Sequence, residues 1–329
     1  MLYPLKFEPI LKEIIWGGDE ICRFKNLHTQ RSGIGESWEV SHVRNNVSVV
    51  AEGELKGKSL EELIETYRER LLGQKVIDRF GTTFPLLIKF IDAREPLSVQ
   101  VHPNDVLAKE RHNSFGKTEM WYVIQAAPGA YLYSGFARSM TPEEYVRSLE
   151  DDTFIDYLQR HEVKPGDVFF LPAGRVHAIG AGCFIAEIQQ TSDITYRIYD
   201  YNRRDANGNP RELHTELAKD AIDFKVYSDY KFNYTHRQQP LQPLVSCPYF
   251  STNLIEGENC NVIQKTPRDS FSIYICLEGS ARLTDGKGYS VEVRQGETVL
   301  VPAENKLTAL TFKEKGKFLE TFILCFFPI

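Results

Sequence analysis

The stretch Gly166-Asp-Val-Phe-Phe-Leu-Pro-Ala-Gly-Arg-Val-His177 occurs twice in this sequence, the second time in altered form. The later copy reads Gly296-Glu-Thr-Val-Leu-Val-Pro-Ala-Glu-Asn-Lys-Leu307, with glycine, acid, a short strand-like run, proline and alanine in the same order. Glycine and proline typically bound short strands. The repeat therefore predicts two β-units built on one plan. Because Leu307 replaces His177, only the first unit can hold a metal at this position.

Short runs of β-branched and aromatic residues surround both copies. They are bounded by Pro, Gly, Asn or Asp and cover 84–91, 97–102, 120–124, 168–171, 271–277, 280–284, 289–293, 298–301 and 318–327. Many short strands at regular spacing are typical of a sandwich or barrel. We therefore expect a mainly β fold of two barrels. A polar stretch at 234–243 is the expected linker, dividing the chain into residues 1–238 and 239–329.

Two segments in the first half predict helices that are inserted in or flank the first barrel. Ser59-Leu-Glu-Glu62 has the form of a capping box and opens a predicted helix at 59–76. Thr141-Pro-Glu-Glu144 repeats this logic and opens a predicted helix at 141–160, with a break near Asp151. A shorter helix is predicted at 213–220.

Composition excludes several classes of protein. Among 329 residues, 42% are hydrophobic and 26% charged, as in a soluble globular chain, and the formal net charge is −6. No basic field that would attract nucleic acid or a membrane surface is therefore expected. The charged opening residues lack the apolar core of a secretory signal. The six cysteines are scattered without a C-x-x-C pair, which favours reduced thiols in the cytoplasm.

A mixed set of nitrogen and oxygen ligands suggests a metal site in the first barrel. Strand alternation places Ser98, Gln100 and His102 on one face, and Glu119 begins a later strand. His102 alone would more often be a core residue, but His177 follows a turn that aims it into the same barrel. Two imidazoles, a carboxylate and an amide suit a borderline divalent ion such as zinc.

The glycine, proline and histidine spacing from Gly166 to His177 resembles the second cupin motif, and Gln100-Val-His102 with Glu119 resembles the first. A narrower resemblance is to type I mannose-6-phosphate isomerases of the short bacterial form. It is carried by Trp16-Gly-Gly, Gly35-Glu-Ser-Trp-Glu39, Pro96-Leu-Ser-Val-Gln-Val-His-Pro-Asn-Asp105, Lys117-Thr-Glu-Met-Trp121 and Thr191-Ser-Asp-Ile-Thr-Tyr-Arg197. These motifs cover residues 16 to about 204.

This resemblance implies a fold of cupin barrels and an aldose–ketose isomerase that interconverts mannose 6-phosphate and fructose 6-phosphate. It also implies one zinc ion and an essential arginine at Arg197. The implied zinc ligands are Gln100, His102, Glu119 and His177. The sequence departs from the longer members in one place: they have a histidine immediately before the lysine, where this chain has Gly116. That histidine cannot carry the proton here.

Further residues are candidates for catalysis and substrate binding. Lys117, two residues before a predicted ligand, is expected at the pocket rim, where it would bind phosphate or assist proton transfer. Asp193 is expected to orient Arg197 or to act as a base. Ser98 lies on the ligand face and would donate to phosphate. Trp16 and Glu36 would wall the pocket.

Two other functions stay open at this point. A cupin that binds a sugar phosphate without turnover has no need of both an essential cation and a full metal set. A metal-dependent oxygenase is disfavoured, because such sites usually use two His and one carboxylate with open positions. A monomer and a homodimer are both compatible with the sequence.

Overall fold

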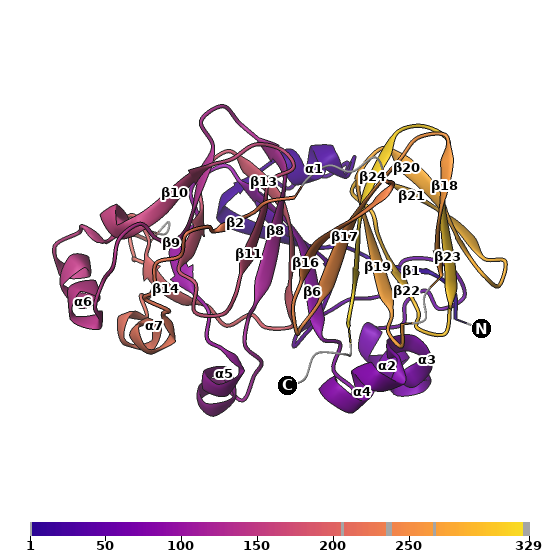
Figure 1. Cartoon of the computed structure of the whole chain (residues 1–329), viewed down its shortest axis with the longest axis horizontal. Coiled ribbons are helices and arrows are strands. Elements are labelled where there is room, and N and C mark those ends of the chain that lie inside the picture. The colour runs from indigo at the N-terminus through magenta and orange to yellow at the C-terminus, as the bar shows by residue number, and fades with distance from the viewer. Residues whose placement is uncertain (1, 205–206, 235–238, 266–267, 325–329) are drawn as a thin grey trace.

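The computed structural model describes residues 2–204, 207–234, 239–265 and 268–324. It shows two β-barrels side by side (Figure 1). The larger sheet of the first barrel runs β15 (Lys231–Phe232), β11 (Val168–Leu171), β8 (Glu119–Ala126), β13 (Cys183–Gln190), β6 (Leu86–Ala93), β2 (Ile10–Gly18), β3 (Ile34–Val40). Its smaller sheet runs β10 (Leu158–Glu162), β9 (Tyr131–Phe136), β12 (His177–Ile179), β7 (Val99–Val101), β14 (Tyr196–Tyr199).

The second barrel also has a larger and a smaller sheet. The larger runs β1 (Leu5–Lys6), β22 (Thr298–Val301), β19 (Ser272–Glu278), β24 (Gly316–Phe322), β17 (Ser251–Gly257), β16 (Leu241–Ser246). The smaller runs β18 (Cys260–Lys265), β23 (Leu307–Phe312), β20 (Ser280–Asp285), β21 (Ser290–Arg294). β1 lies near the start of the chain, so the first residues complete the sheet of the later barrel. A separate hairpin joins β4 (His42–Val43) to β5 (Asn46–Val47).

The two copies of the repeated stretch adopt the same local structure. Gly166 and Gly296 both have positive φ, 91° and 80°, which favours glycine. The carbonyl of Pro172 accepts a hydrogen bond three residues on, and that of Pro302 does the same, each at 3.0 Å. β11 pairs with β8 just as β22 pairs with β19. The prediction of a mainly β fold with a repeated unit is therefore confirmed.

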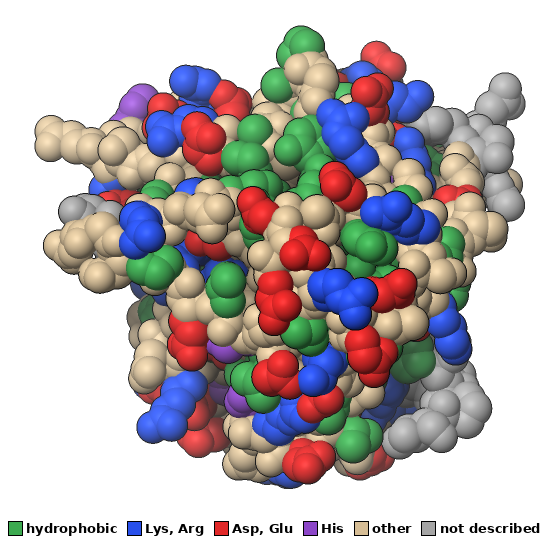
Figure 2. Space-filling view, turned by 90° about the vertical axis from the view of Figure 1, so that its left-hand side faces the viewer, with side chains coloured by type: hydrophobic (Ala, Val, Ile, Leu, Met, Phe, Trp, Pro, Cys, Tyr) green, Lys and Arg blue, Asp and Glu red, His purple; other side chains and the backbone are tan. Residues whose placement is uncertain are grey.

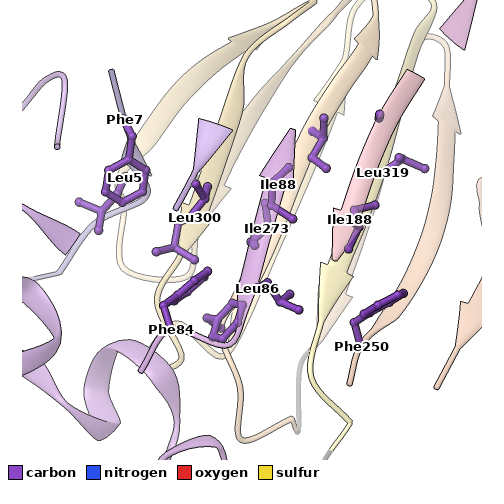
Figure 3. Close-up of a cluster of buried hydrophobic side chains, with 14 of the residues drawn as sticks. Leu5, Phe7, Phe84, Leu86, Ile88, Ile188, Phe250, Ile273, Leu300 and Leu319 are labelled. Carbon is purple, nitrogen blue, oxygen red and sulfur yellow. The ribbon is translucent and has the colours of Figure 1, made fainter. Parts of the chain in front are cut away.

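The larger sheets pack against each other and bury one continuous apolar core. Leu86, Ile88 and Ile188 from the first barrel meet Ile273 and Leu319 from the second (Figure 3). All of these side chains are fully buried. Since burying a Leu or Ile side chain contributes about 1.5–3 kcal/mol, this layer holds the two barrels together.

The first predicted helix is interrupted twice. The capping box of Ser59 and Glu62 is confirmed. The structure has α2 (Leu60–Tyr67), α3 (Glu69–Leu72) and α4 (Gln74–Phe80) in place of one helix at 59–76. Positive φ values at Arg68 and Gly73 break the hydrogen-bond ladder. Leu71 and Leu72 of α3 accept hydrogen bonds from Ala303 and Phe271, so this helical segment contacts the second barrel.

The remaining helices match the predictions in part. α6 (Pro142–Glu150) ends at the predicted break, but a 3₁₀ turn (Phe154–Tyr157) and β10 follow, so the predicted end at 160 was wrong. α7 (Thr215–Ala221) corresponds to the helix predicted at 213–220. Neither α1 (Glu20–Phe24) nor α5 (Asp105–His112) was predicted. The predicted linker at 234–243 extends too far, because β16 begins at Leu241. Residues 235–238 of this linker lie outside the described residues, and so do residues 325–327 of the last predicted strand.

In the described part of the chain, no helix is long and apolar enough to cross a membrane. Figure 2 shows the end of the molecule formed by the first barrel. On this face Lys and Arg are interspersed with Asp and Glu and do not form one positive field.

Candidate metal centre and active site

A row of polar side chains crosses the smaller sheet of the first barrel. His177 on β12 is paired with Ser134 on β9 and with Gln100 on β7, and Gln100 is paired in turn with Arg197 on β14. Residues directly opposite each other in antiparallel strands project from the same face. The register therefore brings three of the predicted site residues, Gln100, His177 and Arg197, into one row on the smaller sheet of the first barrel.

Three predicted metal ligands meet at one point. The Nε2 atoms of His102 and His177 lie 3.6 and 3.3 Å from the carboxylate oxygens of Glu119. All three side chains are buried, and their candidate ligand atoms lie within 4.8 Å of one another. The amide nitrogen of Gln100 lies 3.3 Å from His177 Nε2, so this side chain reaches the same centre.

Backbone carbonyls orient both imidazole rings. His102 Nδ1 lies 2.9 Å from the carbonyl oxygen of Ile194, and His177 Nδ1 lies 2.8 Å from that of Arg175. A carbonyl oxygen only accepts, so each Nδ1 carries the proton and donates it. Each Nε2 is then left with a lone pair that faces the carboxylate of Glu119.

The centre fits a cation. His102 Nε2 and both oxygens of Glu119 are buried and make no hydrogen bond within the described residues. Unpaired buried polar atoms typically cost about 1–3 kcal/mol each. A divalent ion would satisfy all of them, and nitrogen and oxygen ligands of this kind are those that zinc accepts.

Burial also sets the charge of these groups. It lowers the pKa of His177 to about 4 and that of His102 well below its usual range, with Lys117 contributing to both. Both imidazoles are therefore neutral at pH 7, as metal ligation requires. Burial and the neighbouring carboxylate of Glu187 raise the pKa of Glu119.

A buried charged row on the facing sheet was not predicted. Glu187 on β13 accepts a hydrogen bond of 2.9 Å from Trp121 Nε1 and lies 3.3 Å from Lys89 Nζ. Lys89 also lies 3.8 Å from Glu36. Although burial opposes it, Lys89 and Lys117 lower the pKa of Glu187, which is therefore ionised. The available signal was a single lysine inside the otherwise apolar run Leu86–Ile91.

The predicted catalytic residues lie at different depths. Lys117 is buried rather than at the rim, with Nζ 3.5 Å from a Glu119 oxygen. Arg197 is half-buried and donates to the carbonyl of Glu212 at 2.8 Å, while its Nε has no partner among the described residues. Asp193 is exposed. No hydrogen bond or ion pair joins it to Arg197 in the described chain.

The predicted substrate-binding residues are only partly brought together. Glu36 is joined to the buried row through Lys89 and accepts a hydrogen bond of 2.6 Å from Trp38 Nε1. Trp16 belongs to an apolar cluster that also contains Trp121. Ser98 is buried and precedes Gln100 by two residues, immediately before β7 begins at Val99.

The repeated cupin-type barrels and the buried His–Glu–His centre are features of the cupin class of metal-binding proteins. Comparison with known proteins identifies the family within this class. The pattern of the phosphomannose isomerase type I catalytic domain matches residues 5–123. A mannose-6-phosphate isomerase of Bacillus subtilis is 39% identical over 91% of this chain and 93% of its own length. One from Streptococcus mutans is 35% identical over 92% and 93%.

Solved structures agree. The crystal structure of mannose 6-phosphate isomerase from Bacillus subtilis superposes with a TM-score of 0.87 at 31% identity, covering 97% of this chain and 99% of that one. The chain belongs to the type I phosphomannose isomerase family. Membership in a family of isomerases decides against the non-catalytic sugar-phosphate binder considered from sequence.

Proposed function

We propose that the chain interconverts mannose 6-phosphate and fructose 6-phosphate by moving a proton between C1 and C2 through an enediol. One zinc ion would be held by Gln100, His102, Glu119 and His177. The observation that carries the proposal is the pair of neutral imidazoles whose Nε2 atoms converge on a buried carboxylate that accepts no hydrogen bond from the described residues. The position equivalent to His177 in the second barrel is Leu307, which supports a single ion per chain.

A bound metal would supply positive charge that polarises the carbonyl and hydroxyl oxygens of the sugar. The chain's own cations would supply the rest. Arg197 follows in the same row as Gln100 and His177, and its unpaired Nε is available to an enediolate or phosphate oxygen. Lys117, held near Glu119, would stabilise negative charge or assist the proton transfer.

The remaining assignments are proposals of the same kind. Asp193 is a candidate base. Ser98, Trp16 and Glu36 are proposed to bind the substrate or to line its pocket. Of these Glu36 has the most direct support, because it belongs to the charged row on the sheet that also carries Glu119. Division into a catalytic unit at 1–238 and a barrel at 239–329 is proposed. So are a cytoplasmic location and a monomer or homodimer without nucleic-acid or membrane partners.

One assay tests the proposed function. The purified protein is incubated with fructose 6-phosphate before and after treatment with a chelator, and mannose 6-phosphate is measured. We expect product in the untreated sample, loss of product after chelation, and recovery on addition of zinc. Equal product with and without the chelator would contradict the metal-dependent reaction.

A further inference from the structure

The hairpin between β16 and β17 of the second barrel touches the segment that carries the metal ligands. The hydroxyl of Tyr249, at the tip of this hairpin, donates a hydrogen bond of 2.5 Å to Asp105 Oδ2. Asp105 is the first residue of α5, three residues after His102. Burial and the Asp105 carboxylate raise the pKa of Tyr249 above its ordinary value, so its hydroxyl stays protonated and donates.

The other oxygen of Asp105 holds the loop that leads into Glu119. Asp105 Oδ1 accepts hydrogen bonds from the backbone of Gly116 at 2.8 Å and from the side-chain amide of Gln190 at 3.0 Å. The carbonyl of the same Gln190 amide accepts from the backbone of Thr118 at 2.8 Å. Asp105 and Gln190 together thus fix the backbone on both sides of Lys117, immediately before Glu119.

The tip of the hairpin is itself rigid. A backbone hydrogen bond of 2.9 Å from Cys247 to Phe250 closes the turn, and the ring of Phe250 is fully buried in the core between the barrels. Arg79 of α4 donates at 2.6 Å to the carbonyl of Pro248. These contacts fix the position of Tyr249 at the tip of a hairpin that belongs to the second barrel.

A cavity of about 710 Å³ lies between α4, α5 and Tyr249, and the exposed side chains of Val106 and Phe115 line it. The hairpin and the loop lie on opposite sides of this cavity, and the hydrogen bond from Tyr249 to Asp105, together with that from Gly116 to Asp105, connects them through the first turn of α5.

We propose that the second barrel positions the loop at 113–118, which leads into the candidate metal ligand Glu119. Tyr249 is the positioning residue, and it acts on this loop through Asp105. This inference gives the barrel without metal ligands a role in the reaction, and it rests on the proposed function. Hydrogen-bond partners behind metal ligands typically change metal affinity by about 10–100-fold when they are lost. Tyr249 acts through an intermediate residue, so an effect of about tenfold is expected.

The test compares Tyr249→Phe with the unaltered protein in the zinc-loaded enzyme. Metal affinity is measured by competition with a chromophoric chelator, and protection of the amides at 113–118 by hydrogen exchange. We expect about tenfold weaker zinc binding, faster exchange in the loop, and a fall in kcat with KM little changed. Asp105→Asn, which keeps an acceptor for Gly116 and Gln190, should retain more zinc than Asp105→Ala.

Tyr274→Phe is the matched control. Tyr274 is also a buried tyrosine of the second barrel, but its hydroxyl donates to Glu320, remote from the loop. It should leave zinc affinity and loop exchange unchanged. Unaltered zinc affinity and loop exchange in Tyr249→Phe would overturn the inference. Zinc-independent isomerisation by the unaltered protein would instead overturn the metal assignment, while loop exchange still tests the role of Tyr249.

Discussion

A Cβ atom on Gly116 would lie 2.6 Å from the backbone nitrogen of Asp105, far closer than non-bonded atoms approach. The loop before Lys117 thus packs directly against the first turn of α5. This contact leaves no room for the histidine that the resemblance places at this position in the longer family members. In this loop conformation a side chain at position 116 would collide with the backbone of α5, so we expect another group or a water to carry the proton.

Gly116→Ala should therefore displace the loop. We expect kcat to fall at least tenfold and stability to drop by about 1–3 kcal/mol, as for other overpacked sites. Steady-state kinetics and thermal unfolding measure the two effects. Ser114→Ala, in the same loop, is the control and should behave as the unaltered chain. A fully active, equally stable Gly116→Ala protein would show that the loop adopts a different conformation.

His102→Ala and His177→Ala should each lose zinc and activity together, since each removes a neutral nitrogen ligand from a buried centre. Metal content of the purified proteins, measured by elemental analysis, is expected to fall to less than about a tenth of one ion per chain. The exposed His28 provides the control, and His28→Ala should keep its zinc. Full activity in a zinc-free variant would refute the ligand assignment.

Arg197→Ala should separate charge stabilisation from metal binding. Arg197 is paired with Gln100 across the strands, and among the described residues its guanidinium donates to the carbonyl of Glu212 and not to His102, Glu119 or His177, so the variant should keep its zinc. Its kcat should fall by about 100-fold or more if the guanidinium stabilises developing negative charge. Metal content and kcat are measured on the same sample. An unchanged kcat would contradict a catalytic role for Arg197 and leave it only the structural hydrogen bond to the carbonyl of Glu212.

Removing the cation of the buried row should be costly. Lys89→Met leaves the carboxylates of Glu187 and Glu36 without their shared partner, and breaking a buried ion pair typically costs about 3–5 kcal/mol. Chemical unfolding measures the loss. Adding Glu187→Gln removes one uncompensated charge, so the double variant should recover part of the stability. If instead the losses of stability caused by Glu187→Gln and Lys89→Met simply add in the double variant, the two residues do not interact as the structure shows.

Stability should also depend on Asp92. Burial raises its pKa to about 6, against hydrogen bonding from the backbone of Glu20. The folded protein therefore binds a proton that the unfolded chain has lost, and this contribution is present below about pH 4 and lost as pH rises to about 6. Urea unfolding across this range should show a decline that Asp92→Asn lacks. Parallel pH profiles for the two proteins would contradict it.

The strands, the repeat and the convergence of His102, Glu119 and His177 could be predicted because their signals are local. Alternation places Gln100 and His102 on one face, and the turn after Pro172 sets the position of His177. Helix boundaries were less well predicted. Arg68 adopts a positive φ that ends α2, and the following α3 hydrogen-bonds to the second barrel, a contact that the sequence pattern of a helix does not indicate.

The sequence by itself predicted which side chains would bind a metal and that only the first barrel would do so. Only the tertiary structure decided what surrounds the candidate metal centre. Lys89 meets Glu187 through strand register, and Tyr249 meets Asp105 across 144 positions of chain. Register and inter-barrel contacts depend on how distant apolar faces pack, so no short stretch of sequence contains them.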